Sequence, residues 1–293
     1  MCIRDRANAV QVLAGPTANS FEVIGLGGTQ IRFGTTVGPS AIVSSVTAGI
    51  GANLGRGNDT LIVDGSGTNA PLSVFKGIGV NLWVGDDALY VLHVSATGGL
   101  TATGSSGNDR TKVTESSFLG SMVFSGGAGN DLVVVSDTST AASLVSSGGA
   151  GNDQDTFDRM TVGLHYRWNG GADSDTVAFR DSKVSGNTTM NSSLGVDMTT
   201  IALSKFFGLF TWTGSSGDDS LNISDTTFSK KFQALAGAGN DGVVVVRSTF
   251  SDRAIFQGSV GTDTLDAGVP SGSANANTFA VPPTVLAFEI FPS

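Results

Sequence analysis

The sequence predicts an all-β protein, a right-handed parallel β-helix (solenoid) of about ten coils, each with 22 residues and three short strands. Two observations carry this prediction: an aspartate that recurs at a fixed interval, and apolar residues that alternate within each interval. The composition agrees, since 41 of the 293 residues are Gly and 22 Asp stand against only three Glu. Gly and Asp favour turns, whereas Glu favours helices, so a helical protein is not expected.

The string Gly-x-Gly-Asn-Asp recurs with variations along the chain. Its last Asp recurs at eight equal intervals of 22 from Asp87 onward, while the first interval, from Asp59 to Asp87, is longer. We number each repeat so that this residue is position 5. The ten residues at position 5 are Asp59, Asp87, Asp109, Asp131, Asp153, Asp175, Asp197, Asp219, Asp241 and Asp263.

Apolar residues alternate at positions 7 and 9 and again at 18 and 20, with an isolated apolar column at position 14. This period of two predicts short strands, and the Gly, Ser, Thr and Asn residues between them predict turns. One such unit cannot bury a face alone, so identical units must stack, with the right-handed crossover that parallel strands favour. We expect Val135, Phe157, Phe179 and Ile201 to stack at position 9. Trp168 and Trp212, both at position 20, should lie in the core.

The two ends depart from the repeat. Residues 1–6 resemble a translated sequencing adapter of metagenomic origin, and we interpret them as an artefact. On that interpretation the natural N-terminus, with any export signal, is missing. We assign residues 7–54 to an N-terminal cap and partial first coil, with strands at 21–24 and 29–33. Residues 55–268 form the β-helix, and extra residues that lengthen its first interval follow Asp64. Residues 269–293 form a C-terminal cap whose closing strand is 281–291.

Charge and hydropathy exclude two classes of protein. The formal net charge of −9 argues against nucleic-acid binding, which needs cations along the phosphate backbone. No apolar run approaches the length of about 18 residues that a membrane-spanning helix needs. Cys2, the single cysteine, lies in the adapter-like segment, so the fold is expected to need no disulfide.

The segment 126–134, Gly-Gly-Ala-Gly-Asn-Asp-Leu-Val-Val, resembles the repeats-in-toxin (RTX, hemolysin-type) nonapeptide, and 148–156 and 236–244 match it nearly as well. The resemblance implies calcium bound between stacked Gly-rich turns, with the apolar residue in the core. The RTX family places these nonapeptides in tandem, whereas here each coil has one, so only one edge would carry sites. The longer unit also resembles the Gly-Asn-Asp repeats of secreted bacterial β-helix proteins.

The position-5 carboxylates are therefore candidate calcium ligands, together with turn carbonyls, because calcium prefers oxygen. Stacked about 4.8 Å apart, ionised carboxylates repel by about 0.9 kcal/mol per adjacent pair even in water, which cations would offset. The alternative is that each Asp caps N–H groups of its own turn. We favour coils with Asn or Asp at position 4, while Val196 and Thr262 mark poor ones. The predicted metal ligands are Asp59, Asp87, Asp109, Asp131, Asp153, Asp219 and Asp241.

The repeat breaks most at 153–181, where an active site would be sought. Asp155 stands at an inward apolar position, and Asp173 replaces a Gly. An acidic and Arg-containing cluster here would suit a carbohydrate-active β-helix enzyme, a polysaccharide lyase or hydrolase. Stacked ion pairs, Asp158 with Arg180 and Arg159 with Asp181, would instead absorb most of this charge. We therefore predict that Asp155 and Asp173 are structural and that the protein has no catalytic residues.

The sequence is thus interpreted as a secreted or cell-surface bacterial β-solenoid with a structural or adhesive role and calcium-binding turns. A cell-surface or extracellular polysaccharide is the expected partner; nucleic acid and a membrane span are not expected. Ser and Thr are frequent at position 12, which suggests an ice-binding face, but Met160 interrupts that column and no paired Thr-x-Thr array accompanies it. The ligand, the organism and the oligomeric state are left open.

Overall fold

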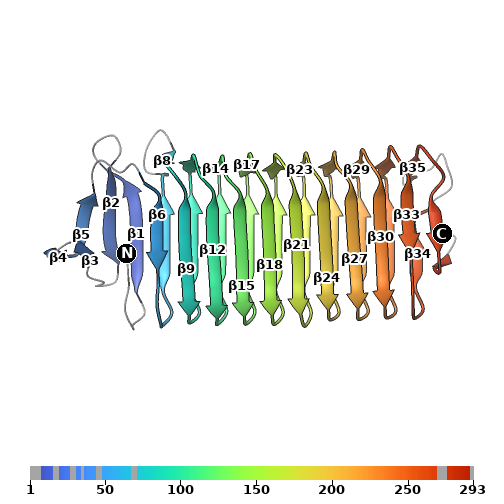
Figure 1. Cartoon of the computed structure of the whole chain (residues 1–293), viewed down its shortest axis with the longest axis horizontal. Coiled ribbons are helices and arrows are strands. Elements are labelled where there is room, and N and C mark those ends of the chain that lie inside the picture. The colour runs from blue at the N-terminus through green and yellow to red at the C-terminus, as the bar shows by residue number, and fades with distance from the viewer. Residues whose placement is uncertain are drawn as a thin grey trace. The chain divides into compact units, whose positions relative to one another are not determined.

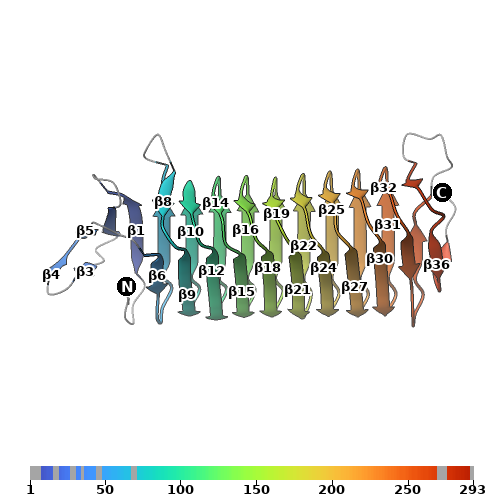
Figure 2. The same ribbon diagram turned by 45° about the horizontal axis from the view of Figure 1, so that its top comes forward.

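The computed structural model describes residues 8–15, 20–26, 31–33, 36–43, 48–66, 71–268 and 276–290. All regular secondary structure in these residues is β, and none of them forms a helix that could cross a membrane (Figure 1). The chain divides into two compact units, Met1–Ala142 and Ser143–Ser293. In each unit the chain visits three stacks of parallel strands in turn, as Figures 1 and 2 show. The predicted all-β parallel β-helix is confirmed, and its right-handedness stays a prediction.

A representative coil of the first unit consists of β10 (Ala88–Leu92), β11 (Val94–Ala96) and β12 (Leu100–Ser106). The equivalent strands of neighbouring coils stack on each of them. With β10 lie β7 (Thr60–Asp64), β13 (Arg110–Thr114) and β16 (Leu132–Ser136); with β11 lie β8 (Leu72–Val74), β14 (Ser117–Phe118) and β17 (Ser139–Thr140); with β12 lie β6 (Ile50–Asn53), β9 (Ile78–Val84) and β15 (Met122–Ala128).

The N-terminal residues close the first of these stacks. Strand β1 (Ala9–Ala14) pairs in parallel with β7, and β2 (Phe21–Leu26) and β5 (Ser40–Val43) continue the sheet antiparallel. Strands β3 (Ile31–Phe33) and β4 (Thr36–Gly38) form a separate hairpin. The expected strand at 21–24 is therefore present, and that at 29–33 is shorter among the described residues. Strand β1 was not expected, and residues 1–6 lie outside the described residues.

The second unit repeats the same coil. Its first stack contains β19 (Gln154–Asp158), β22 (Thr176–Arg180), β25 (Met198–Ala202), β28 (Ser220–Ser224), β31 (Gly242–Val246), β34 (Thr264–Asp266) and β37 (Glu289–Ile290). Its second contains β20 (Thr161–Val162), β23 (Lys183–Val184), β26 (Lys205–Phe206), β29 (Thr227–Phe228), β32 (Thr249–Phe250) and β35 (Thr278–Phe279). Its third contains β18 (Leu144–Ala150), β21 (Tyr166–Ala172), β24 (Thr188–Leu194), β27 (Phe210–Ser216), β30 (Phe232–Ala238), β33 (Ala254–Gln257) and β36 (Thr284–Leu286).

The register follows the predicted period. Phe157 pairs with Phe179, and Phe179 with Ile201, so this part of the position-9 column stacks as predicted. Strands β7 and β10 pair Asp64 with Leu92, and the sequence separation between these two residues is still longer than the regular period. The next pair, Leu72 with Val94, is already at the regular spacing. The extra residues therefore lie between Asp64 and Leu72, as expected.

The C-terminal region differs from the single closing strand expected at 281–291. Three short strands, β35, β36 and β37, pair in parallel with β32, β33 and β34. They form one more irregular coil, in which Phe279 pairs with Phe250 through a connection longer than the regular period. The longer connection breaks the regular period, and the repeat could therefore not be recognised in the sequence after Ala267.

Aromatic rings stack along the core of the second unit. At position 14, the rings of Phe206 and Phe228 are 5.4 Å apart, those of Phe228 and Phe250 5.0 Å, and those of Phe250 and Phe279 4.8 Å. Such pairs contribute about 0.5–1.5 kcal/mol each beyond their buried area. Trp168 and Trp212 are buried, as predicted for position 20.

The Ser and Thr residues at position 12 are buried as well. Each accepts a hydrogen bond from a backbone N–H of the preceding coil, as Ser204 does from Ser182 at 3.1 Å. Each also donates to a carbonyl of its own turn, as Ser204 does to Ala202 at 2.8 Å. This column therefore cannot form an ice-binding face. The buried hydroxyls are Ser116, Thr138, Ser182, Ser204, Thr226 and Ser248.

Candidate metal site in the aspartate column

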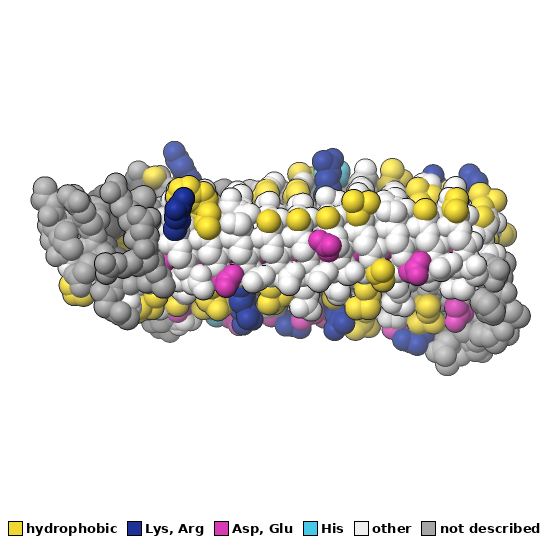
Figure 3. All heavy atoms as spheres, turned by 90° about the horizontal axis from the view of Figure 1, so that it is seen from below, with side chains coloured by type: hydrophobic (Ala, Val, Ile, Leu, Met, Phe, Trp, Pro, Cys, Tyr) yellow, Lys and Arg dark blue, Asp and Glu magenta, His cyan; other side chains and the backbone are white. Residues whose placement is uncertain are grey.

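The position-5 aspartates point into the protein. Their exposed fractions lie between 1% and 5%, and this holds for every predicted ligand. Figure 3 views the molecule from the side on which β9, β12 and β15 end in Figure 1. Acidic side chains there are few and scattered among uncharged atoms. The carboxylates therefore belong to the interior, where an ionised group needs compensation. We refer to these ten residues, Asp59 to Asp263 at position 5, as the Asp column.

Within each unit, one carboxylate oxygen of the aspartates has a fixed role. Oδ1 accepts a hydrogen bond from the backbone N–H of the aspartate one coil earlier: Asp87 from Asp59 at 2.7 Å, and Asp219 from Asp197 at 2.9 Å. The expected cap is thus present, but its donor lies in the preceding coil rather than in the same turn. Asp59 itself accepts from the N–H of Asn8 at 2.7 Å, so the residue directly before β1 supplies the first donor.

The second oxygen has no such role. No described group donates a hydrogen bond to Oδ2 of Asp59, Asp87, Asp109, Asp175, Asp197, Asp219 or Asp241, although each of these atoms is buried. Leaving a buried acceptor unsatisfied costs about 1–3 kcal/mol, and more when the group is charged. A column of such atoms therefore requires a proton, a cation or water that the protein chain does not supply.

Small residues make room for this oxygen. In most coils position 22, five residues before the aspartate, is glycine. A Cβ placed on Gly214 would lie 2.7 Å from Asp219 Oδ2 and would also clash with the carbonyl oxygen of Ala236 in the next coil. Gly104 has the same two neighbours, Asp109 Oδ2 and the Gly126 carbonyl. Two hydrogen-bond acceptors thus border one small space, which is the arrangement that a cation or a carboxyl proton satisfies.

Burial changes the ionisation of the Asp column. Desolvation raises the pKa of Asp109, Asp175 and Asp219 to about 7, with neighbouring aspartates adding to the rise. It raises the pKa of Asp87 and Asp241 to about 6 for the same reasons. The hydrogen bond from the preceding N–H acts in the opposite direction but is the smaller effect. The carboxylates are therefore poised to bind protons or cations near neutral pH.

The last residue of the Asp column is an internal comparison. Asp263 accepts the N–H of Asp241 on Oδ1 at 3.1 Å and the N–H of Ser259 on Oδ2 at 2.8 Å. Both of its oxygens are satisfied by the chain. The unsatisfied Oδ2 is therefore a property of the regular coils, not of aspartate at this position.

Position 4 does not change the hydrogen bonds of the Asp column. Its side chains form a separate exposed column, in which Asn58 accepts from the N–H of Asp86 at 3.0 Å and Asn152 from that of Ser174 at 2.8 Å. Asp175 and Asp197, which the sequence rule left out, have the same Oδ1 contact and the same unsatisfied Oδ2 as Asp219. Their place in the regular period was the signal that could have included them.

The fit to calcium is partial. Within the described residues, no three side chains among His, Cys, Asp and Glu come together to hold a metal ion. At Asp109, Asp175 and Asp219 the chain instead offers one carboxylate oxygen without a described donor beside a backbone carbonyl, and both are ligands that calcium accepts. The Asp column is compatible with calcium on these grounds, while a complete set of about six to eight ligands would need further carbonyls or water.

The charged break at 153–181 is organised by structural contacts. Asp155 is buried and accepts a hydrogen bond from Ser146 Oγ at 2.6 Å. Asp173 Oδ2 accepts from the N–H of Gly151 at 3.2 Å. The expected ion pair of Asp158 with Arg180 is absent, because Asp158 pairs with its neighbour Arg159.

The two histidines are also separate. His93 pairs with Glu115 at 2.8 Å, and His165 Nδ1 accepts from the N–H of Asn187 at 3.0 Å. Among the described residues, neither lies in a cluster that could hold a metal.

Comparison with known proteins adds little to this picture. No family model matches the sequence, and no curated protein matches it. One similar solved structure is a hyperactive, Ca²⁺-dependent, β-helical antifreeze protein from an Antarctic bacterium. It has 21% sequence identity and a TM-score of 0.44 over 77% of this chain and 67% of that chain. The fold assignment therefore rests on the strand register of this chain itself.

Proposed function

We propose that this chain is a non-catalytic structural and adhesive β-solenoid that works outside the cell, secreted or on the cell surface. Calcium bound along the Asp column, in the manner of RTX-like repeats, would stabilise it, and a polysaccharide would be its partner. The observation that carries the proposal is the series of buried Oδ2 atoms without a described donor, which at Asp109, Asp175 and Asp219 lie beside a glycine at position 22.

The physical argument concerns what fills the space beside Oδ2. Protons could neutralise these carboxylates, but they would neutralise the whole Asp column only at acidic pH, because the highest pKa values in the column are about 7. A divalent cation neutralises the carboxylates and also binds the nearby carbonyl oxygen. An extracellular setting would supply such cations. Bound cations would also stabilise a chain that has a single cysteine, Cys2, and so cannot form an internal disulfide.

The linkage to stability gives the magnitude. A ligand that binds only the folded chain stabilises it by about 2.7 kcal/mol when its free concentration is a hundred times Kd. The unfolded chain cannot hold the stacked arrangement, so calcium should act on the folded state alone. Magnesium is the matched control, because it demands octahedral geometry and releases water reluctantly.

The test is elemental analysis of the purified protein together with thermal melts in calcium, in magnesium and in chelator. We expect bound calcium and a melting temperature that is highest in calcium. Coincident melting curves with no bound metal would overturn the calcium part of the proposal and leave the Asp column as a set of hydrogen-bond acceptors.

A further inference from the structure

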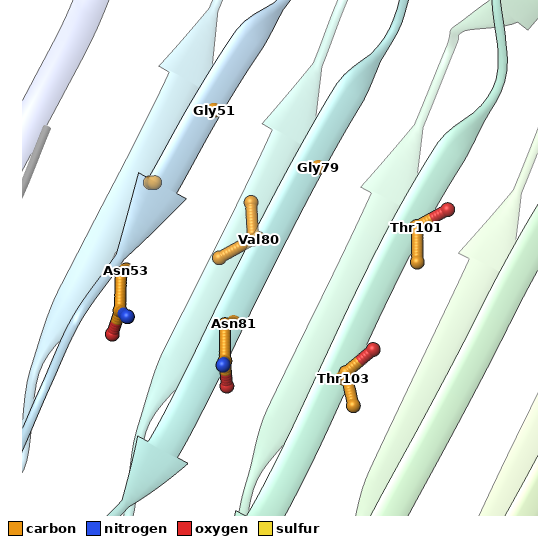
Figure 4. Close-up of a pocket in the computed structure, with 8 residues that line it drawn as sticks. Gly51, Asn53, Gly79, Val80, Asn81, Thr101 and Thr103 are labelled. Carbon is orange, nitrogen blue, oxygen red and sulfur yellow. The ribbon is translucent and has the colours of Figure 1, made fainter.

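A shallow hollow of about 550 Å³ lies on the exposed side of β6, β9 and β12 in the first unit (Figure 4). Its outward residues come in two rows, one at position 19 and one at position 21. The first row is Gly51, Gly79 and Thr101, and the second is Asn53, Asn81 and Thr103.

Two glycines create the hollow. A Cβ placed on Gly51 or Gly79 would meet no atom within 4 Å, so nothing in the packing requires glycine there. The next coil has Thr101 at the same position, which shows that the strand accepts a larger residue. The absence of these two side chains leaves the strand backbone as the floor of the hollow, because Ala52 and Val80 between the outward residues are buried in the core.

The polar groups around the hollow are available to a ligand. Asn53, Asn81, Thr101 and Thr103 are exposed, and their side chains make no hydrogen bond to any described residue. Asparagines at position 21 in the second unit behave differently. Asn191 Nδ2 donates to Asn169 Oδ1 at 3.2 Å, and the Ser193 hydroxyl donates to the same oxygen at 2.7 Å. The hollow thus has amide and hydroxyl groups that both donate and accept and that the chain does not use.

Trp83 lies on the same strand as the central residues of the hollow, outside the residues that line it. It follows Asn81 by two residues on β9, about 7 Å along the strand, and its side chain is 44% exposed. Its φ of 72° is left-handed, whereas Gly or Ser stands at the equivalent left-handed position in other coils, as at Gly55 and Ser193. A bulky residue is rarely found there. An exposed ring is thus kept at a position where smaller residues are easier to accommodate.

The chemistry points to an uncharged ligand with many hydroxyl groups. No charged residue is among the described residues that line the hollow, so these residues offer no charge to a phosphate or a carboxylate. An extended peptide would need a free sheet edge, but β9 is paired on both sides, by β6 and β12. A sugar ring has an apolar face that can stack on an indole and hydroxyls that match amides and threonines.

We infer that this hollow, together with Trp83, binds a neutral carbohydrate chain. One sugar ring lies over the Gly51–Gly79 floor and hydrogen-bonds to Asn53, Asn81 and Thr103. An adjoining ring stacks on Trp83. This inference deepens the adhesive part of the proposed function by naming its site and ligand class, and it is independent of calcium.

Tryptophan fluorescence tests it directly, because Trp168 and Trp212 are 3% and 0% exposed and Trp83 alone is open to solvent among the three. The probes are cellohexaose, laminarihexaose, maltohexaose and mannohexaose, with a galacturonic acid oligomer as the charged control. We expect at least one neutral hexasaccharide to shift the emission saturably and to protect Trp83 from acrylamide quenching. The charged oligomer should do neither.

Three variants locate the site. Gly79→Thr fills the hollow with the residue of the next coil, retains the fluorescent ring and should weaken binding about tenfold or more. Gly242→Thr makes the same change at a partly exposed position of β31 in the second unit, where the new Cβ meets only Thr264 Oγ1 at 3.7 Å, and should bind as wild type. Trp83→Gly, followed by calorimetry, should also weaken binding about tenfold while raising the melting temperature.

If none of the four hexasaccharides is bound at millimolar concentration, the inference is wrong. Binding that survives Gly79→Thr would place an adhesive surface elsewhere and overturn this site, while the proposed adhesive function would stand. The calcium melts are read separately, so a failure of the calcium proposal would not be confused with either result.

Discussion

The second unit has two buried polar columns, the Asp column at position 5 and the hydroxyl column at position 12. Both accept hydrogen bonds from buried backbone N–H groups, but they differ in how their own polar atoms are satisfied. Both accept a backbone N–H from the preceding coil, as Asp219 does from Asp197 and Ser204 does from Ser182. The Ser204 hydroxyl then donates to the carbonyl of Ala202 at 2.8 Å. The Asp219 carboxylate has no described donor for its second oxygen.

The difference lies in the chemistry of the two groups. A hydroxyl both donates and accepts, so one side chain bonds to a backbone N–H and to a backbone carbonyl and has its own donor and acceptor paired. An ionised carboxylate only accepts, so a buried one depends on something from solution. The hydroxyl column should therefore be indifferent to pH and calcium, whereas the stability of the Asp column should depend on both. The predictions below test this contrast.

The largest effect should come from pH, because it acts on several carboxyls at once. The folded-state pKa is about 7 for Asp109, Asp175 and Asp219, above the ordinary value of 3.8. A raised pKa means that the folded chain binds protons more tightly than the unfolded chain, so stability is gained on acidification and lost as the pH rises through 7. In chelator, the melting temperature should fall steadily between pH 5 and pH 8. Calcium should flatten that slope, and a flat profile in chelator would contradict the assignment.

The substitution Asp219→Ala should come next. It removes the acceptor of the buried Asp197 N–H, so the free energy of unfolding should fall by about 1–3 kcal/mol. For a domain of roughly 150–250 residues, each 1 kcal/mol corresponds to about 2–4 °C in melting temperature. The matched control is Asp263→Ala, because both carboxylate oxygens of Asp263 already accept hydrogen bonds from backbone N–H groups. That variant should be destabilised equally in calcium and in chelator, whereas Asp219→Ala should lose more in calcium.

A smaller effect is expected for Ser204→Ala. This change removes one acceptor for the Ser182 N–H and one donor to Ala202, and it should cost about 1 kcal/mol. The same decrease should be measured by thermal melting in calcium and in chelator, at pH 5 and at pH 8. A calcium-dependent decrease would mean that the two columns are not independent.

The sequence predicted the parts of the fold that repeat. The period of the Asp column and the apolar columns at positions 9, 14 and 20 defined the coil, and the insertion after Asp64 was placed correctly. The C-terminal coil was not predicted, because its longer connection breaks the period. Strand β1 was missed because it has no equivalent Asp nearby.

The candidate site was predicted only in outline. Spacing identified the position-5 aspartates, but not that they point inward, because an Asp in a Gly-rich turn is compatible with either direction. The position-4 rule left out Asp175 and Asp197, since position 4 belongs to a different, exposed column. The strained backbone of Trp83 has no sequence signal at all. Only coordinates show its left-handed φ of 72° and the hollow at Gly51 and Gly79 on the neighbouring positions of the sheet.

The most direct test of the central claim is a variant with Asn at three successive coils, Asp197→Asn, Asp219→Asn and Asp241→Asn. Each amide keeps the oxygen that accepts the preceding N–H and places an N–H donor where Oδ2 lacked one. In chelator the variant should melt at or above the wild-type temperature. In calcium it should gain clearly less than wild type and bind fewer calcium ions per chain. A variant that is destabilised in chelator, yet gains as much from calcium as wild type, would contradict the account.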